Sequence, residues 1–267
     1  MKITWLDDVE PRARRVALGQ FDGVHLGHRR LIAGCDTVVT FDPHPQAVLA
    51  PDRAPALLSP LHRKAELMAR LHVEELVVIP FDRERAAQSA EDFVTSVLVD
   101  ALGTTQVSVG ENFRFGHRAA GDPGMLARDP RLTARIVPLL HVGGAAVAST
   151  RVRGLVADAR VEEAALLLGS PVYLAGQVRW ATRSALGTTV ADVAFAAGQA
   201  IPAAGTFRCH GMGRPATLTI GPAPDDPPLS GRLVGDLALE VGETIGLELS
   251  ARVDAGPARR PAAVAAA

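Results

Sequence analysis

Short apolar runs alternate with helical patterns over the first two thirds of the chain. The runs are rich in β-branched residues and predict strands at 16–18, 36–41, 76–81, 107–109 and 135–139. Ser59-Pro60 and the Ser89/Asp92 pair are typical helix starts, and apolar residues at helical spacing follow each of them. Repeated strand–helix units predict a mostly parallel sheet with right-handed crossovers.

The expected binding crevice follows from this pattern. In a parallel sheet, ligands bind beyond the carboxyl ends of the strands. Gly19, Asp42 and Gly110 each come directly after a strand-like run. We therefore expect these three positions to converge on one crevice.

The pattern changes near residue 170. Helical spacing over 149–156 and 160–168 ends at Gly169-Ser170-Pro171, and Ser149-Thr150 is expected to cap the first of these helices. Short strands with Gly and Pro turns follow at 173–177, 189–195, 206–210, 216–220, 231–239 and 245–253. They predict a small antiparallel barrel. The expected domains are therefore 1–170 and 171–256, followed by a low-complexity, disordered tail at 257–267.

Composition narrows the class of protein. The 267 residues are 48% apolar and carry 28 basic and 29 acidic side chains, so a core is available and nothing points to nucleic-acid or membrane partners. Cys35 and Cys209 lack the spacing of a zinc site or a disulfide framework. The N-terminus lacks the apolar core of a signal peptide, so we expect a cytoplasmic protein. The sequence does not predict an oligomeric state.

The string from Gly19 to His28 carries the clearest chemistry. It reads as strand, glycine turn and helix start, which places His25 and His28 on one face of the first helical turn. Gly27 lets a ligand approach the backbone, and free N–H groups at a helix start favour an anion. Two imidazoles beside such a site suit a polyphosphate, which favours nucleotidyl transfer. The plainer alternative is a glycine turn with two surface histidines.

Three later segments could join this string. The loop 110–117 places an amide, Asn112, beside two phenylalanines that could flank a flat heterocycle, although it could equally be a hydrophobic plug. Residues 149–153 place hydroxyls and Arg153 at a helix start and suit a second phosphate site, or else plain capping with solvated arginines. The turn 40–45 is rigid, and alone it could be only a loop.

These segments together carry a family resemblance. GQFDGVHLGH (19–28), TFDPHP (40–45), GENFRFGHRAAGD (110–122) and STRVR (149–153) resemble, in order and spacing, the FMN adenylyltransferase module of bacterial FAD synthetases. Those enzymes are bifunctional riboflavin kinase/FMN adenylyltransferases. The resemblance covers roughly residues 14–170. It implies a Rossmann-like nucleotidyltransferase fold with ATP and FMN as substrates, FAD as product, and Mg²⁺.

The resemblance also implies roles for individual residues. Catalytic roles fall on His25, His28 and Arg153. Nucleotide binding falls on Gly19, Phe21, Asp22, Gly27, Ser149 and Thr150. Flavin binding falls on Asp42, His44, Asn112, Phe113, Arg114 and Phe115.

The chain departs from the family pattern in several places. Only residues 29–36 lie between the first string and the β-branched run from Thr37 that leads into the second, so about three helical turns are missing. The family's Ile-Ser-Ser-Thr is Val-Ala-Ser-Thr at 147–150. In the barrel, the family's Pro-Thr-Ala-Asn signature is Thr-Val-Ala-Asp at 189–192, and no carboxylate stands at 229–233 where a base is expected. A valine methyl cannot ligate Mg²⁺, so the barrel is interpreted as a degenerate riboflavin kinase domain.

Three functions stay open at this point. The first is AMP transfer from ATP to FMN. The second is the same chemistry on another phosphorylated heterocycle, which the short helix and degenerate barrel would suit. The third is non-catalytic flavin or nucleotide binding, against which the complete histidine string and Arg153 argue.

Overall fold

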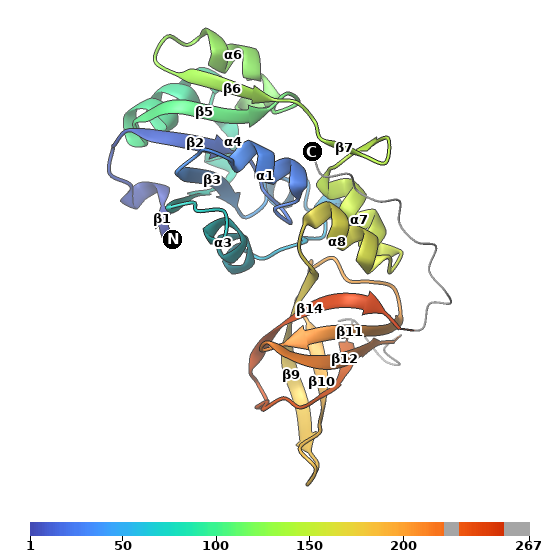
Figure 1. Ribbon diagram of the computed structural model, residues 1–267. Helices are drawn as coiled ribbons and strands as arrows, with labels where there is room; N and C mark the ends of the chain where they lie inside the picture. The colour runs from blue at the N-terminus through green and yellow to red at the C-terminus, as the bar shows by residue number, and fades with distance from the viewer. Residues whose placement is uncertain (222–229, 254–267) are drawn as a thin grey trace. The chain divides into compact units, whose positions relative to one another are not determined.

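The computed structural model describes residues 1–221 and 230–253, so the tail predicted at 257–267 lies outside the described residues. The chain forms two compact units (Figure 1). Unit 1 comprises Met1–Pro55 and Leu61–Leu140, and unit 2 comprises Ala56–Pro60 and the chain from His141 onward. Helices α7 (Ser149–Ala157) and α8 (Val161–Leu168) therefore group with the barrel, whose first strand begins just after the predicted boundary at 170.

Unit 1 is built on a six-stranded sheet in the order β1-β4-β3-β2-β5-β6, and every neighbouring pair is parallel. The strands are β1 (Lys2–Trp5), β2 (Arg14–Leu18), β3 (Thr37–Asp42), β4 (Glu75–Pro80), β5 (Thr104–Gly110) and β6 (Thr133–Val137). This arrangement confirms the predicted parallel α/β sheet.

Helices cover both faces of this sheet. Along β2, Ala17 joins one apolar cluster with residues of α1 (Leu26–Ile32) and α3 (Leu61–Ala69). Val16 and Leu18 join a second cluster with residues of Phe93–Ala101 and α6 (Pro123–Arg128). This alternation is the two-sided burial expected of a parallel sheet. The helical segments are α1 (Leu26–Ile32), α2 (Pro45–Leu49), α3 (Leu61–Ala69), α4 (Arg83–Ala87), α5 (Ala90–Asp92), the π-helix η3 (Phe93–Ala101) and α6 (Pro123–Arg128), with single 3₁₀ turns η1 (Leu6–Asp8), η2 (Pro51–Arg53) and η4 (His117–Ala119).

The edge strand β1 is absent from the sequence-based prediction. Ile3 and Trp5 are exposed and Thr4 is buried, so β1 lacks the apolar alternation that marks a strand. The Thr4 hydroxyl instead donates to Glu75 Oε1 at 2.9 Å, and buried Arg14 donates to Glu75 Oε2 at 3.1 Å. Burial alone would raise the pKa of Glu75, but these hydrogen bonds and the Arg14 charge outweigh it and hold that pKa below its ordinary value.

Unit 2 contains a closed antiparallel barrel in the order β10-β13-β12-β11-β14-β9, which confirms the predicted barrel. Its strands are β9 (Val172–Arg183), β10 (Thr189–Phe195), β11 (Gly205–Gly211), β12 (Arg214–Ile220), β13 (Ser230–Gly235) and β14 (Thr244–Arg252). The hairpin β7 (His141–Val142) and β8 (Ala145–Ala146) and helices α7 (Ser149–Ala157) and α8 (Val161–Leu168) precede it. No helix within residues 1–221 and 230–253 is long and apolar enough to cross a membrane.

Two local predictions are wrong. The strand predicted at 231–239 ends at Gly235, and the carbonyl of Leu237 instead accepts a hydrogen bond from the Thr189 hydroxyl. The N-cap of α7 is Ala148, with no side-chain capping bond, so Ser149 is the first helical residue. The Ser-Thr pair therefore stands inside the first turn.

Candidate functional site

Three neighbouring strands bring the predicted loops to one edge of the sheet. β3, β2 and β5 are adjacent and parallel, so their carboxyl ends lie together. Gly19 follows β2 directly, while Asp42 and Gly110 are the last residues of β3 and β5. The Gly19 N–H donates to the Val39 carbonyl at 3.1 Å, which ties the histidine turn to β3. These three positions therefore lie at one edge of the sheet, as expected, although none of them lines the pocket described below.

The two histidines form a stacked pair at the start of α1. His25 is the N-cap, and its Nδ1 accepts a hydrogen bond from the His28 backbone N–H at 3.2 Å. The two rings lie with centroids 3.5 Å apart and planes 14° apart, so they share one face as predicted. Because Nδ1 accepts this bond, a neutral His25 carries its proton on Nε2.

Phe21 supports this pair from inside unit 1. Its ring is completely buried, meets the His28 ring edge-on at 5.3 Å, and lies so close to Gly19 that a Cβ there would come within 3.3 Å of it. The ring is thus unavailable to a nucleotide, which could contact only the Phe21 backbone. Phe21 and Val24 have φ of 51° and 43°. Non-glycine residues in the left-handed region cost free energy and persist only where the surrounding structure holds them in place. Such residues cluster at functional sites.

Burial also lowers the pKa of a side chain on α1, that of Arg29. Arg29 Nε donates to the Val24 carbonyl at 3.2 Å, which ties α1 to the turn that precedes it. Burial, with a smaller contribution from the charge of Arg70, lowers the pKa of Arg29.

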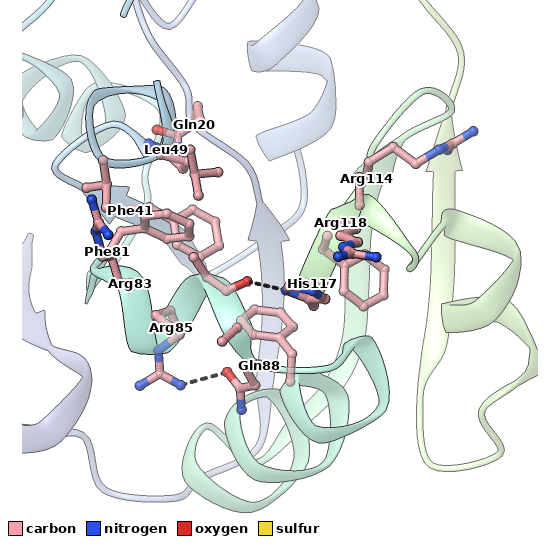
Figure 2. A pocket seen from close by; sticks show the side chains of 18 of the residues that line it. Gln20, Phe41, Leu49, Phe81, Arg83, Arg85, Gln88, Arg114, His117 and Arg118 are labelled. Atoms are coloured by element: carbon pink, nitrogen blue, oxygen red, sulfur yellow. Dashed lines mark hydrogen bonds between the residues drawn. The ribbon is translucent and has the colours of Figure 1, made fainter. Parts of the chain in front are cut away.

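An aromatic pocket of about 720 Å³ opens in the same unit (Figure 2). Phenylalanines and arginines dominate its lining, which contains no Asp or Glu. The lining is Gln20, Phe41, Pro45, Val48, Leu49, Phe81, Arg83, Arg85, Ala86, Ala87, Gln88, Phe93, Phe113, Arg114, Phe115, Gly116, His117, Arg118 and Ala119. Such a lining suits a flat aromatic body that carries an anionic group.

The two motif phenylalanines occupy one wall of this pocket instead of flanking its space. Phe113 and Phe115 stack on each other with centroids 5.7 Å apart and planes at 19°. A ring between them would need about 7 Å, which is twice a carbon–carbon contact distance. Phe115 is buried and packs on Phe93 of the core at 5.8 Å. The two rings therefore leave no room for a heterocycle between them, and the packing of Phe115 fits the alternative of a hydrophobic plug.

His117 fixes the loop that forms this wall. Its backbone N–H donates to the Gln88 carbonyl at 2.7 Å, and its Nδ1 lies 3.2 Å from the Ala86 carbonyl. The next two residues, Arg118 and Ala119, have φ of 52° and 59°. Figure 2 shows Arg118 and Arg114 on the side of the pocket opposite Phe41 and Phe81.

The predicted flavin residues divide between the pocket lining and its surroundings. Phe113, Arg114 and Phe115 line it, whereas Asp42, His44 and Asn112 do not. His44 instead caps α2 through its Nδ1, which accepts from the Gln46 N–H at 3.2 Å. Helix α2 then contributes Pro45, Val48 and Leu49 to the wall, and Asn112 stands exposed beyond Gly110.

Sequence reasoning missed several lining residues, namely Gln20, Phe41, Phe81, Arg83, Arg85, Phe93 and His117. Phe41 lies near the carboxyl end of β3 and Phe81 directly follows β4. An aromatic residue at the carboxyl end of a parallel strand was therefore the signal that could have identified these two phenylalanines.

In unit 2, the predicted phosphate-binding residues lie on the first turns of α7. Ser149, Thr150 and Arg153 are three and four positions apart and so share one face of the helix. Arg153 Nε donates to the Ala56 carbonyl at 2.7 Å. Arg151 is committed to the β7–β8 hairpin through bonds of 2.9 Å to the carbonyls of Val142 and Ala145.

A parallel sheet whose crevice edge carries a stacked HxGH pair at a helix start defines a nucleotidyltransferase-like domain. The chain belongs to the FAD synthetase family. Residues 7–151, more than half of the chain, match the family model described as FAD synthetase.

Curated relatives agree with this assignment. The chain is 34% identical over 176 residues to the bifunctional riboflavin kinase/FMN adenylyltransferase of Escherichia coli K12, covering 61% of this chain and 56% of that protein. The proteins of the same description from Pseudomonas fluorescens (33% over 199 residues, 69% of this chain and 64% of that protein) and Listeria monocytogenes (37% over 176 residues, 61% and 56%) are similar. These matches span 56–64% of the length of the relatives.

A solved structure shares the whole fold. A crystal structure described as a macrolide-efflux protein from Streptococcus pneumoniae superposes with a TM-score of 0.81, covering 95% of this chain and 91% of that one. Sequence identity is 22%, so this likeness concerns the fold.

Proposed function

We propose that the protein transfers the AMP group of ATP to FMN and releases FAD and pyrophosphate. The proposal rests on the observation that one continuous segment, residues 20–28, connects the aromatic pocket to the histidine pair. Gln20 lines the aromatic pocket, and His25 and His28 follow it within the same string. A phosphorylated flat heterocycle suits this combination of an aromatic pocket and a phosphate-binding turn.

The proposed chemistry is an in-line displacement. An FMN phosphate oxygen attacks the α-phosphorus of ATP, the new P–O bond forms, and the bond to pyrophosphate breaks. His25 donates through Nε2–H and, with His28, stabilises the charge that develops on the phosphate oxygens. Fixed donors of this kind act mainly through electrostatics and positioning, and no covalent intermediate is needed.

Family membership implies Mg²⁺ together with ATP. Within the described residues, no three His, Cys, Asp or Glu side chains cluster closely enough to hold a metal ion. Mg²⁺ is usually held largely by nucleotide phosphates and water, with few protein ligands. Bound with ATP, Mg²⁺ would neutralise phosphate charge.

We also assign phosphate binding to Ser149, Thr150 and Arg153 of α7. The support is their common helix face, at an end where free N–H groups favour anions. An Arg153→Ala variant should raise the KM for ATP and lower kcat. An unchanged ATP dependence would remove α7 from the assignment.

An acceptor panel tests the proposed function. Pyrophosphate release is measured with ATP and Mg²⁺ against FMN, riboflavin and several other phosphorylated heterocycles. FMN should give the highest kcat/KM, and riboflavin should give none because it lacks the attacking phosphate. A better substrate among the other phosphates would replace FMN as the acceptor, and binding of FMN without any turnover would favour a non-catalytic flavin-binding protein.

We further propose that the barrel has no riboflavin kinase activity. Val190 and Asp192 alternate along β10 with the buried Thr189, Ala191 and Val193, so they face away from the barrel interior. Asp192 Oδ1 accepts from Arg232 Nε at 3.4 Å. The Thr189 hydroxyl turns inward, but it is already bonded to the carbonyl of Leu237 and accepts from Arg183 Nη1 at 3.1 Å.

An assay of FMN formation from riboflavin and ATP tests whether the barrel lacks riboflavin kinase activity, with a bifunctional enzyme as the positive control. Val190→Thr alone should not restore activity, because no carboxylate at 230–233 can serve as the base. FMN formation at an ordinary enzymatic rate would contradict the assignment.

A further inference from the structure

Gln20 is held rigidly at the junction of the histidine turn and the aromatic pocket. Its backbone carbonyl accepts hydrogen bonds from Thr40 Oγ1 at 3.1 Å and from Lys64 Nζ at 3.0 Å. Its side chain lines the pocket at the end that also holds Leu49 (Figure 2). The backbone is therefore fixed from two sides, and only the side-chain torsions of Gln20 can adjust to a ligand.

The amide of Gln20 is unsatisfied. Both Oε1 and Nε2 are shielded from solvent, and within the described residues neither has a hydrogen-bond partner. A buried donor or acceptor without a partner costs free energy, because the hydrogen bonds it loses to water are not replaced. Native proteins contain few such groups, and those that persist call for an explanation such as a missing ligand.

The second glutamine of the pocket provides an internal comparison. Gln88 Oε1 accepts from Arg85 Nη1 at 2.8 Å, and Gln88 Nε2 donates to Ser96 Oγ at 2.9 Å. Both of its amide atoms are thus used within the protein. Of the two amides that line the pocket, only that of Gln20 has its full donor and acceptor capacity available.

We propose that Gln20 determines the specificity of the pocket for the acceptor heterocycle. Its Nε2–H donates to a ring carbonyl and its Oε1 accepts from the adjacent ring N–H, so it reads a lactam or imide edge. The flavin ring has such an edge, where N3–H lies between two carbonyls. A primary amide can make both bonds at once because its donor and acceptor point the same way. This inference rests on the proposed function, in that the pocket holds the acceptor.

The test combines two variants with two ligands. FMN and N3-methyl-FMN, in which the ring N–H is blocked, are titrated by quenching of flavin fluorescence without ATP. The wild type should bind FMN about tenfold or more tightly than the methylated analogue. Gln20→Met keeps the side-chain length and removes both polar atoms, so it should bind the two ligands alike and FMN about tenfold more weakly than the wild type does.

Melting temperatures separate this role from a structural one. Gln20→Met removes an unsatisfied amide and should leave the Tm unchanged or raise it, whereas Gln88→Met breaks two bonds and should lower it. Gln88→Met should retain the preference for FMN over its N3-methyl analogue. If Gln20→Met also retains that preference, the inference is overturned while FMN binding stands. If the wild type binds no FMN, the proposed function fails as well.

Discussion

Replacing His28 by alanine separates catalysis from folding. The ring is half-buried at the third position of α1, where it stacks on His25 and meets Phe21 edge-on. Losing the aromatic contact costs about 0.5–1.5 kcal/mol of stability, and the higher helix propensity of alanine returns about 0.5 kcal/mol. The Tm should therefore fall by only a few degrees.

The expected effect on turnover is much larger. Loss of one preorganised donor to the transition state costs about 2.7–4 kcal/mol, or 10²–10³ in kcat. The assay is steady-state FAD formation, followed by chromatography, at a temperature well below the melting transition of the variant. Circular dichroism at the same temperature verifies that the protein is folded.

His25 supplies the matched control. Its ring accepts the capping bond at the start of α1, so His25→Ala removes both cap and imidazole and should lower stability by a further ~1 kcal/mol. His25→Asn keeps a good N-cap and loses only the imidazole. It loses the same ring stacking as His28→Ala, so it should match His28→Ala both in lost turnover and in its small fall in Tm. Near-wild-type kinetics in His28→Ala, or activity that simply follows the Tm across the three variants, would show that the histidine pair has no catalytic role.

Three further predictions concern the loop, the sheet edge and the thiols. Asn112 lies outside the pocket lining but directly precedes the pocket residue Phe113, so if it reads the acceptor as the sequence predicts, Asn112→Ala should raise the KM for FMN several-fold and leave that for ATP unchanged; an unchanged KM for FMN would remove Asn112 from the acceptor site, and the reverse pattern would move this loop to the nucleotide side. Glu75→Ala leaves Arg14 buried without its carboxylate and should lower the free energy of unfolding in urea by about 3–5 kcal/mol at pH 7. Because the folded pKa of Glu75 is lowered, its contribution is complete above the unfolded pKa of about 4.3 and is lost as pH falls through the folded pKa, so an equal deficit at pH 3 would contradict this role. Burial raises the pKa of Cys35, and raises that of Cys209 to about 12, so a thiol reagent at pH 8 should label neither until urea is added, and rapid labelling of the folded protein would contradict this.

Much of the fold was predictable because its strands have strong local patterns. β10 was predicted with its observed bounds, since four buried residues alternate with half-buried ones along it. β1 gave no such pattern, because its stability comes from parallel pairing with β4 and from the buried Thr4–Glu75 bond. Contacts between residues about 70 positions apart leave no periodic trace in the local sequence.

The site was predictable only in part, for a related reason. The stacked histidines follow from two positions within one turn, and local spacing fixes them. The pocket draws Phe41, Phe81 and Phe93 from three separate elements, so it depends on how β3, β4 and η3 pack. The position of Phe115 could not be predicted for the same reason, because its ring packs on Phe93, and the sequence of the loop alone does not indicate that contact.

The most direct test follows the label of ATP during the reaction. The protein is incubated with FMN, Mg²⁺ and ATP labelled at the α-phosphorus, and the products are separated by chromatography. We expect label in FAD, formed one-to-one with pyrophosphate, and no label in FAD from ATP labelled at the γ-phosphorus. Folded protein that forms neither labelled FAD nor pyrophosphate with both substrates saturating would contradict the account.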